Sequence, residues 1–129
     1  MTQTIASITL VVPDYDAAIA FYRDSLGFTL LEDTKLSDTK RWVRVAPPGA
    51  ETALLLAKAD GQAQVAAIGN QTGGRVGFFL HTNDFARDHA AMLAKGVSFR
   101  EEPRFEPYGT VAVFEDPFGN LWDLIEPKA

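Results

Sequence analysis

The alternation of apolar and polar residues divides the first half of the chain into four strands and one helix. A run rich in β-branched residues at 5–12 predicts the first strand. Apolar residues then recur at helical spacing over 16–26, and Gly27 follows as a typical helix C-cap. Apolar runs predict three further strands, listed here by range: 28–32, 41–45 and 52–57. A polar loop is expected at 34–39.

The second half shows the same order of patterns. It predicts a strand at 75–82, a helix at 86–95 that ends at Gly96, and a strand beginning at 97. After the polar segment 101–106, residues 111–126 predict a hairpin around Asp116-Pro117-Phe118-Gly119-Asn120, whose Asp, Pro and Gly are typical turn residues. Each half therefore consists of one strand, one helix and three strands.

Matched residues at a constant spacing indicate a tandem duplication. Asp84 lies 70 residues after Asp14 (84 − 14), and Pro117 lies 70 residues after Pro47 (117 − 47). We therefore expect one module at about 4–58 and a second at about 75–127. The Gly-, Ala- and Gln-rich stretch at about 59–74 is the expected linker, with a short helix at 62–68.

Composition limits the classes of function. With 129 residues, 47% hydrophobic and 22% charged, the chain is typical of one globular domain. A formal net charge of −5 argues against nucleic acid as a partner. The chain has no cysteine, which excludes disulfides, thiolate metal ligands and a cysteine nucleophile. With no signal-peptide pattern and no apolar run of roughly 20 residues, we expect a cytoplasmic protein without a membrane partner.

Three segments, in this order, resemble the vicinal oxygen chelate superfamily, which includes glyoxalases, bleomycin-resistance proteins and extradiol dioxygenases. Val12–Tyr22 resembles its strand-to-helix junction, Leu26–Phe28 its helix end, and Phe114–Asn120 its late turn. The resemblance implies an α+β fold in which two tandem βαβββ modules form a curled mixed sheet, a half-barrel around a cavity, with the helices outside. It also implies a homodimer.

The resemblance further implies metal ligands on the first and last strand of each module. In this sequence those four positions fall on Ser7, Ala53, Gly77 and Asp123. Only Asp123 carries a good ligand for a divalent ion, so no metal site is predicted. His89, among charged residues of the second helix, is expected to be exposed to solvent.

Strand alternation places His81 on the same face as Gly77 and Phe79, toward the implied cavity. His81 and Asp123 are therefore the candidate catalytic pair. A mixture of small, apolar and a few polar side chains is typical of a small-molecule pocket. The candidate ligand-binding residues are Ser7, Thr9, Leu55, Phe79, His81, Tyr108, Val113 and Asp123. Trp42 is expected to pack against a helix or a partner subunit.

Two functions remain open from the sequence. The first is a metal-free binding protein, similar in strategy to bleomycin-resistance proteins, that holds a small organic molecule in the cavity between the modules. The second is a metal-dependent, glyoxalase-like lyase, isomerase or dioxygenase with a rearranged site. That site would use His81 and Asp123, with a divalent metal as Lewis acid or His81 as general base. No Gly-x-Ser-x-Gly elbow or phosphate-binding glycine loop occurs.

Overall fold

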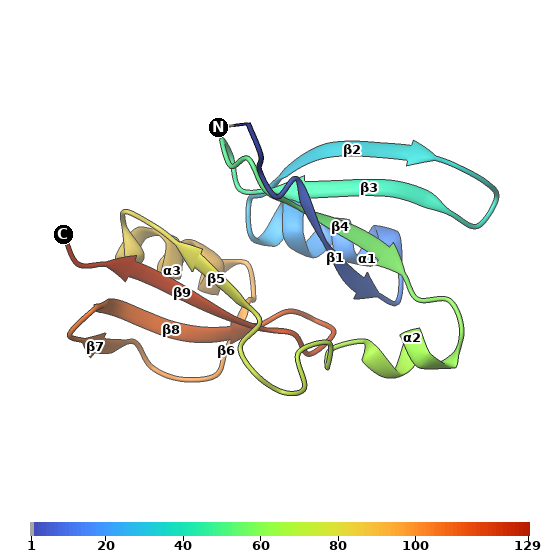
Figure 1. The fold of residues 1–129 in the computed structure, drawn as a ribbon. Coiled ribbons are helices and arrows are strands. Elements are labelled where there is room, and N and C mark those ends of the chain that lie inside the picture. Colours follow the sequence, from blue (N-terminus) through green and yellow to red (C-terminus); the bar gives the residue numbers. More distant parts are fainter. Residues whose placement is uncertain (1) are drawn as a thin grey trace. The chain divides into compact units, whose positions relative to one another are not determined.

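The computed structural model describes residues 2–129, which fall into two compact units. Unit 1 ends at Ile68, and unit 2 is Gly69–Ala129. Each unit contains its own mixed β-sheet and its own helix packed on one face of that sheet (Figure 1).

Unit 1 has the predicted order of strand, helix and three strands. Its elements are β1 (Ser7–Val12), α1 (Tyr15–Ile19), a π-helical continuation η1 (Ala20–Ser25), β2 (Thr29–Lys35), β3 (Arg41–Ala46), β4 (Ala53–Lys58) and α2 (Gln62–Ala67). The strand order in the sheet is β1-β4-β3-β2, with β1 parallel to β4 and the other pairs antiparallel. The short helix expected at 62–68 is present as α2, and β2 extends into the segment expected to be a loop.

Local chemistry explains where the first helix begins and ends. The side chain of Asp14 accepts a hydrogen bond from the backbone N–H of Ala17 at 2.8 Å, which is N-cap geometry. The last turns widen to π-helical bonding, with the Leu26 N–H donating to the carbonyl of Phe21. Gly27 then ends the helix with φ +81°, a conformation that favours glycine.

Unit 2 differs from unit 1 in the part of the chain that follows its helix. Its elements are β5 (Phe78–His81), α3 (Phe85–Ala94), β6 (Ser98–Phe99), β7 (Arg104–Glu106), β8 (Gly109–Glu115) and β9 (Leu121–Pro127). The sheet order is β5-β9-β8-β6, and β7 also pairs with β8. The strand expected from residue 97 is present as the short β6, and a further strand, β7, forms within the segment 101–106 that was expected to be polar and without a strand. Between the two strands, the Val113 N–H donates to the carboxylate of Glu101 (3.0 Å), and the Val113 carbonyl accepts the Arg100 N–H (2.8 Å).

Aromatic rings build the core of unit 2 between its sheet and α3. Trp122 stacks on Phe78 and Phe114, with centroids 4.6 and 5.8 Å apart. His89 lies between Phe85 and Phe99, with centroids 5.2 and 4.5 Å away. The expectation that His89 is exposed to solvent is therefore wrong, because its turn of α3 faces these rings and leaves it half-buried.

Neither sheet is strongly curled, which differs from the curl that the resemblance implies. The sheet of unit 1 has four strands, and that of unit 2 has five when β7 is included. No helix within residues 2–129 is both long and apolar enough to cross a membrane.

Candidate functional site

The spacing between equivalent residues of the two units shortens along the chain. Val45 and Phe114 are both fully buried on the helix side of their sheets and lie 69 residues apart (114 − 45). Leu56 and Leu124, also fully buried, lie 68 residues apart (124 − 56). The helix and the hairpin turn are therefore each one residue shorter in unit 2, and the spacing of 70 holds only near the start of each unit.

This shortening changes which residue of unit 1 is equivalent to Asp123. Asp123 pairs with Phe79 across β9 and β5, whereas Ser7 pairs with Ala53 across β1 and β4. At a spacing of 68, the counterpart of Asp123 is Leu55 (123 − 68), so the assignment of Ala53 is wrong by two residues. A shift of two keeps the same sheet face, so the face predicted for these residues is unaffected.

The side chains at these positions do not fit a divalent metal. The Ser7 hydroxyl already accepts a hydrogen bond from the Arg44 Nε at 3.1 Å. Leu55 and Gly77 have no donor atom, which leaves the carboxylate of Asp123. Throughout residues 2–129, no group of three or more His, Cys, Asp or Glu side chains is placed to hold a metal ion.

Asp123 has an unusual environment for a carboxylate. It lies on the face of the unit 2 sheet opposite α3, between Phe79 of β5 and Val113 of β8. Its Oδ1 atom is buried, and among the described residues no hydrogen-bond donor reaches it. Burial raises the pKa of Asp123, the positive charge of Arg104 opposes this rise, and the negative charge of Glu101 adds to it.

Arg104 is held by carboxylates other than Asp123. Its Nε donates to both carboxylate oxygens of Glu101, at 3.1 and 3.0 Å, and its Nη1 donates to Glu106 at 3.1 Å. The hydrogen bond with Glu101, followed by one with Tyr108, raises the pKa of Arg104 above its ordinary value. Arg104 therefore screens Asp123 without forming an ion pair with it.

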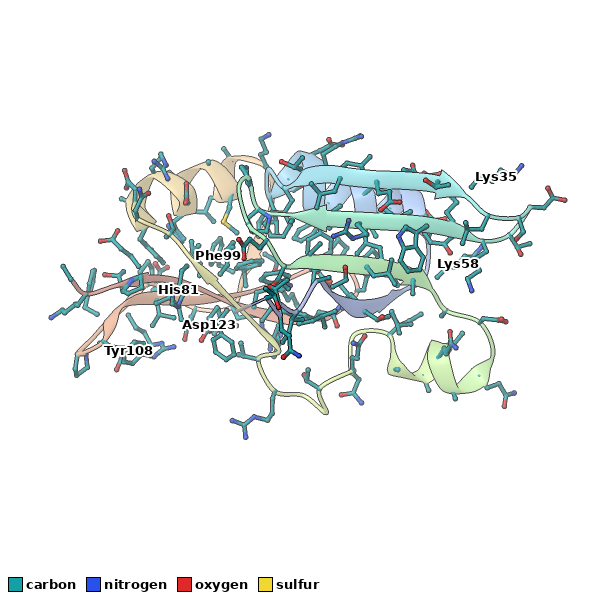
Figure 2. All side chains as sticks on the ribbon, turned by 45° about the horizontal axis from the view of Figure 1, so that its top comes forward. Lys35, Lys58, His81, Phe99, Tyr108 and Asp123 are labelled. Atoms are coloured by element: carbon teal, nitrogen blue, oxygen red, sulfur yellow. The ribbon has the colours of Figure 1, made fainter. Side chains whose placement is uncertain are left out.

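The predicted residues of unit 2 meet only in part (Figure 2). Phe79, Val113 and Asp123 are direct neighbours across three strands. His81 is exposed on the same face, paired with Ile125, so it is diagonal to Asp123 and no hydrogen bond joins the two side chains. Tyr108 lies in the turn between β7 and β8 and is 54% exposed.

A pocket of about 580 Å³ opens in unit 1, at the end of the sheet where β4 ends and β3 begins. It contains two of the predicted residues, Thr9 and Leu55, but not Ser7. Its other lining residues are Tyr15, Thr39, Lys40, Arg41, Trp42, Leu56, Ala57, Lys58, Ala59, Asp60 and Gln64. A second pocket, of about 570 Å³, lies beside the C-terminus in unit 2 and contains none of the predicted residues.

Trp42 is the large aromatic side chain of the unit 1 pocket, so it does not pack against α1, and packing against a partner subunit stays a prediction. Arg44 pairs with Leu55, and Trp42 is two residues from Arg44 on the same strand. Trp42 therefore shares the face of Leu55, and it is 39% exposed in the pocket wall. Strand alternation contained this signal, but it required the register between β3 and β4.

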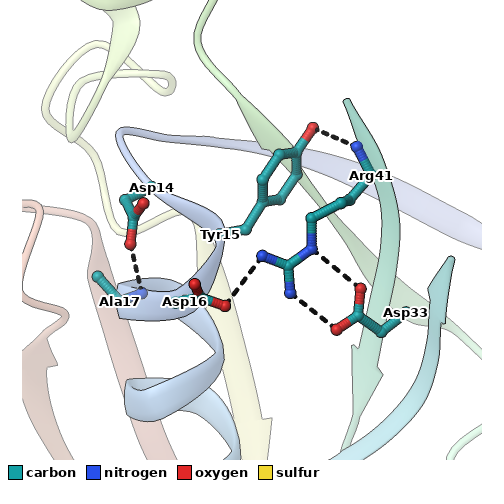
Figure 3. Close-up of polar contacts among 6 residues, drawn as sticks. All are labelled: Asp14, Tyr15, Asp16, Ala17, Asp33 and Arg41. Carbon is teal, nitrogen blue, oxygen red and sulfur yellow. Dashed lines mark hydrogen bonds and ion pairs between the residues drawn. The ribbon is translucent and has the colours of Figure 1, made fainter. Parts of the chain in front are cut away.

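A cluster of polar contacts around Arg41 braces the same pocket (Figure 3). Arg41 donates from Nε and Nη2 to the two oxygens of Asp33 in β2, at 3.1 and 2.8 Å. Its Nη1 donates to Asp16 in α1 at 2.9 Å, and its guanidinium lies 5.2 Å from the centroid of the Tyr15 ring. The Tyr15 hydroxyl accepts the backbone N–H of Arg41 at 3.1 Å. These contacts join the helix to two strands directly beside Trp42.

Comparisons with known proteins agree over nearly the whole chain. An uncharacterized protein of Shewanella frigidimarina (strain NCIMB 400) is 53% identical, over 98% of this chain and 95% of that protein. TnmS3, described as an antibiotic binding protein from Streptomyces sp. CB03234, has a structure with a TM-score of 0.79 and 31% identity, covering 98% of each chain.

A protein from Sphaerobacter thermophilus DSM 20745, described as a member of the glyoxalase/bleomycin resistance protein/dioxygenase superfamily, has a structure with a TM-score of 0.75 and 30% identity, covering 97% of this chain and 98% of that one. The family model described as the Glyoxalase/Bleomycin resistance protein/Dioxygenase superfamily matches residues 4–124. With two βαβββ-like units and a match of this length, the chain belongs to the glyoxalase/bleomycin resistance protein/dioxygenase superfamily.

Proposed function

We propose that this protein binds a small organic molecule in the unit 1 pocket without transforming it chemically. The observation that carries the proposal is the exposed face of Trp42 in a pocket of about 580 Å³. Small-molecule sites have volumes of about 300–1,000 Å³ and combine aromatic surface with a few polar groups. Thr9 and Leu55 supply further polar and apolar wall.

The donor atoms of the chain support binding over metal-assisted catalysis. The positions expected to ligate a metal offer one carboxylate, Asp123, and a structural serine, Ser7, whose hydroxyl is bonded to Arg44. Similarity to TnmS3, which is described as an antibiotic binding protein, adds support from a relative. The homodimer, the single cavity between modules and the cytoplasmic location stay predictions.

Binding of a neutral aromatic probe, N-phenyl-1-naphthylamine, tests the proposal. Its fluorescence should rise on titration with the protein, and Trp42→Leu should weaken binding about tenfold, because a stacking partner and its buried area are removed. Phe105→Leu is the matched control, since Phe105 is an aromatic residue of unit 2 that is 85% exposed and lies outside the pocket.

Two results would contradict the proposal. One is equal binding of the probe by the wild type and Trp42→Leu. The other is a stoichiometric divalent ion in protein purified without chelators, together with an enzymatic activity that is lost when the ion is removed.

A second candidate function, acid–base catalysis of the lyase or isomerase type, rests on the environment of Asp123. A carboxyl group whose pKa is raised by burial, with a histidine diagonal to it on the same sheet face, offers an acid and a base to one substrate. Asp123 would hold the proton and His81 would accept one from a substrate bound against Phe79.

Substitution of His81 tests this second candidate. In a screen of carbonyl and epimerisable substrates, any turnover should fall at least about a hundredfold in His81→Ala if His81 is the base. Turnover that is unchanged in His81→Ala and in Asp123→Asn would reject this role for both residues.

A further inference from the structure

The lysines of unit 1 that have no ion-pair partner among the described residues are the ones that line the pocket. The unit has six lysine and arginine side chains: Arg23, Lys35, Lys40, Arg41, Arg44 and Lys58. Four of them form ion pairs: Arg23 with Asp24, Lys35 with Asp38, Arg41 with Asp33 and Asp16, and Arg44 with Glu32. The other two, Lys40 and Lys58, form no ion pair within residues 2–129, and both line the pocket.

The strand arrangement places these two lysines at one end of the sheet. Lys58 is the last residue of β4, and Lys40 directly precedes β3, which runs antiparallel to β4. The end of one strand therefore lies beside the start of the other, and the pocket takes in both faces of the sheet there: alternation puts Lys40 on the face of Trp42 and Lys58 on that of Leu56. Figure 2 shows Lys58 at this end of β4. The whole chain has a formal net charge of −5, so two uncompensated cations beside one pocket favour a locally positive electrostatic potential there.

The other charges at the pocket do not cancel this pair. Arg41 also lines the pocket, but its guanidinium is taken up by Asp33 and Asp16. Asp60 contributes one carboxylate that forms no ion pair among the described residues, and its backbone N–H donates to Gln64 in α2. Among the described residues, the pocket lining therefore carries two unpaired ammonium groups and one unpaired carboxylate.

Resting on the proposed small-molecule binding, we propose that the ligand is an aromatic anion. Its ring lies against Trp42, and its carboxylate, sulfonate or phosphate group lies between Lys40 and Lys58. An ammonium group binds an anionic oxygen through a charge-assisted hydrogen bond, which is stronger than a neutral one. Thr9 lies on the strand face of Trp42 and supplies a hydroxyl to the same wall.

Three naphthalene derivatives of matched shape test the charge preference by calorimetry: 2-naphthoate, 2-naphthamide and 2-naphthylmethylammonium. The naphthoate should bind about tenfold more tightly than the amide, and the ammonium compound should bind most weakly. Because screening acts on charge, raising the salt concentration should weaken naphthoate binding and leave amide binding unchanged.

Single substitutions test which residues cause the preference for an anionic ligand. Lys40→Gln and Lys58→Gln should each weaken naphthoate binding about fivefold and leave amide binding unchanged. Asp60→Asn should strengthen naphthoate binding. Lys35→Gln is the matched control, because Lys35 is an exposed lysine of the same unit that pairs with Asp38 and lies outside the pocket.

The outcomes separate this inference from the function on which it rests. Equal affinity for the three compounds, or tighter binding of the amide or ammonium compound, overturns the anionic ligand and leaves small-molecule binding intact. Naphthoate binding that is unaffected by both lysine substitutions also overturns it. If none of the compounds binds and N-phenyl-1-naphthylamine does not bind either, both proposals fail.

Discussion

At the residue scale, Asp123 places a carboxylate oxygen where no hydrogen-bond donor of the described residues reaches it. Burial of an unpaired polar atom costs free energy, and the cost is greater when the group is ionised. The pKa of Asp123 is raised for this reason, with Arg104 limiting the rise. A ligand that donates an N–H or O–H to Oδ1 would relieve the cost, which is why the residue remains part of the second candidate function.

We predict that Asp123→Asn stabilises the protein near neutral pH by about 1 kcal/mol, because the amide carries no charge at a position where burial disfavours one. Because the pKa is higher in the folded state, the folded protein binds more protons, and stability falls as pH rises from the unfolded pKa through the folded one. The gain should therefore be present at pH 7 and absent near pH 3, as measured by urea unfolding.

Asp60→Asn is the control for this comparison, since Asp60 is an exposed carboxylate and its substitution should change the free energy of unfolding by less than about 0.5 kcal/mol. Destabilisation by Asp123→Asn at pH 7 would show that the ionised carboxylate is already satisfied in solution.

At the element scale, the contacts of Arg41 connect α1, β2 and β3 at the wall of the pocket (Figure 3). The two parallel hydrogen bonds to Asp33 need the planar guanidinium, which a lysine ammonium cannot replace. Both side chains are partly buried, at 26% and 31% exposed, so solvent screens this pair less than it screens a fully exposed surface ion pair.

We predict that Arg41→Lys and Asp33→Asn each lower the free energy of unfolding by about 1 kcal/mol, the upper end for ion pairs open to solvent. The hydrogen bond from Arg41 lowers the pKa of Asp33 in the folded state. The stabilisation is therefore present above the unfolded pKa and is lost as pH falls through the lower, folded value.

A double-mutant cycle measured by urea unfolding at pH 7 and near pH 2 checks this prediction. It should give a coupling energy of about 1 kcal/mol at pH 7 and a much smaller one at the lower pH. A coupling near zero at both pH values would mean that the contacts of Arg41 do not stabilise the fold.

At the scale of the whole molecule, the two units share one plan but carry different chemistry. Unit 1 presents Trp42 and two unpaired lysines in a pocket, whereas unit 2 presents Asp123 and His81 on the sheet face opposite its helix. Duplication followed by divergence of the face residues accounts for this contrast, since the helix-side core positions of both sheets remain apolar.

The amino-acid sequence by itself determined the order of the elements, the capping of the helices and the twofold repeat. These features depend on residues close together in the chain, such as Asp14 and Gly27 at the ends of the first helix. The motifs that carry the superfamily resemblance are local in the same sense, and the match over residues 4–124 confirmed it.

Only the tertiary structure decided which side chains meet. Two single-residue shortenings in unit 2 changed the counterpart of Asp123 from Ala53 to Leu55. The pocket depends on the pairing of Leu55 with Arg44 across β4 and β3. The same antiparallel pairing brings the end of β4, at Lys58, beside the start of β3, after Lys40. Strand register is set by the lengths of turns and helices and by the packing they allow, so a pattern of neighbouring residues does not fix it.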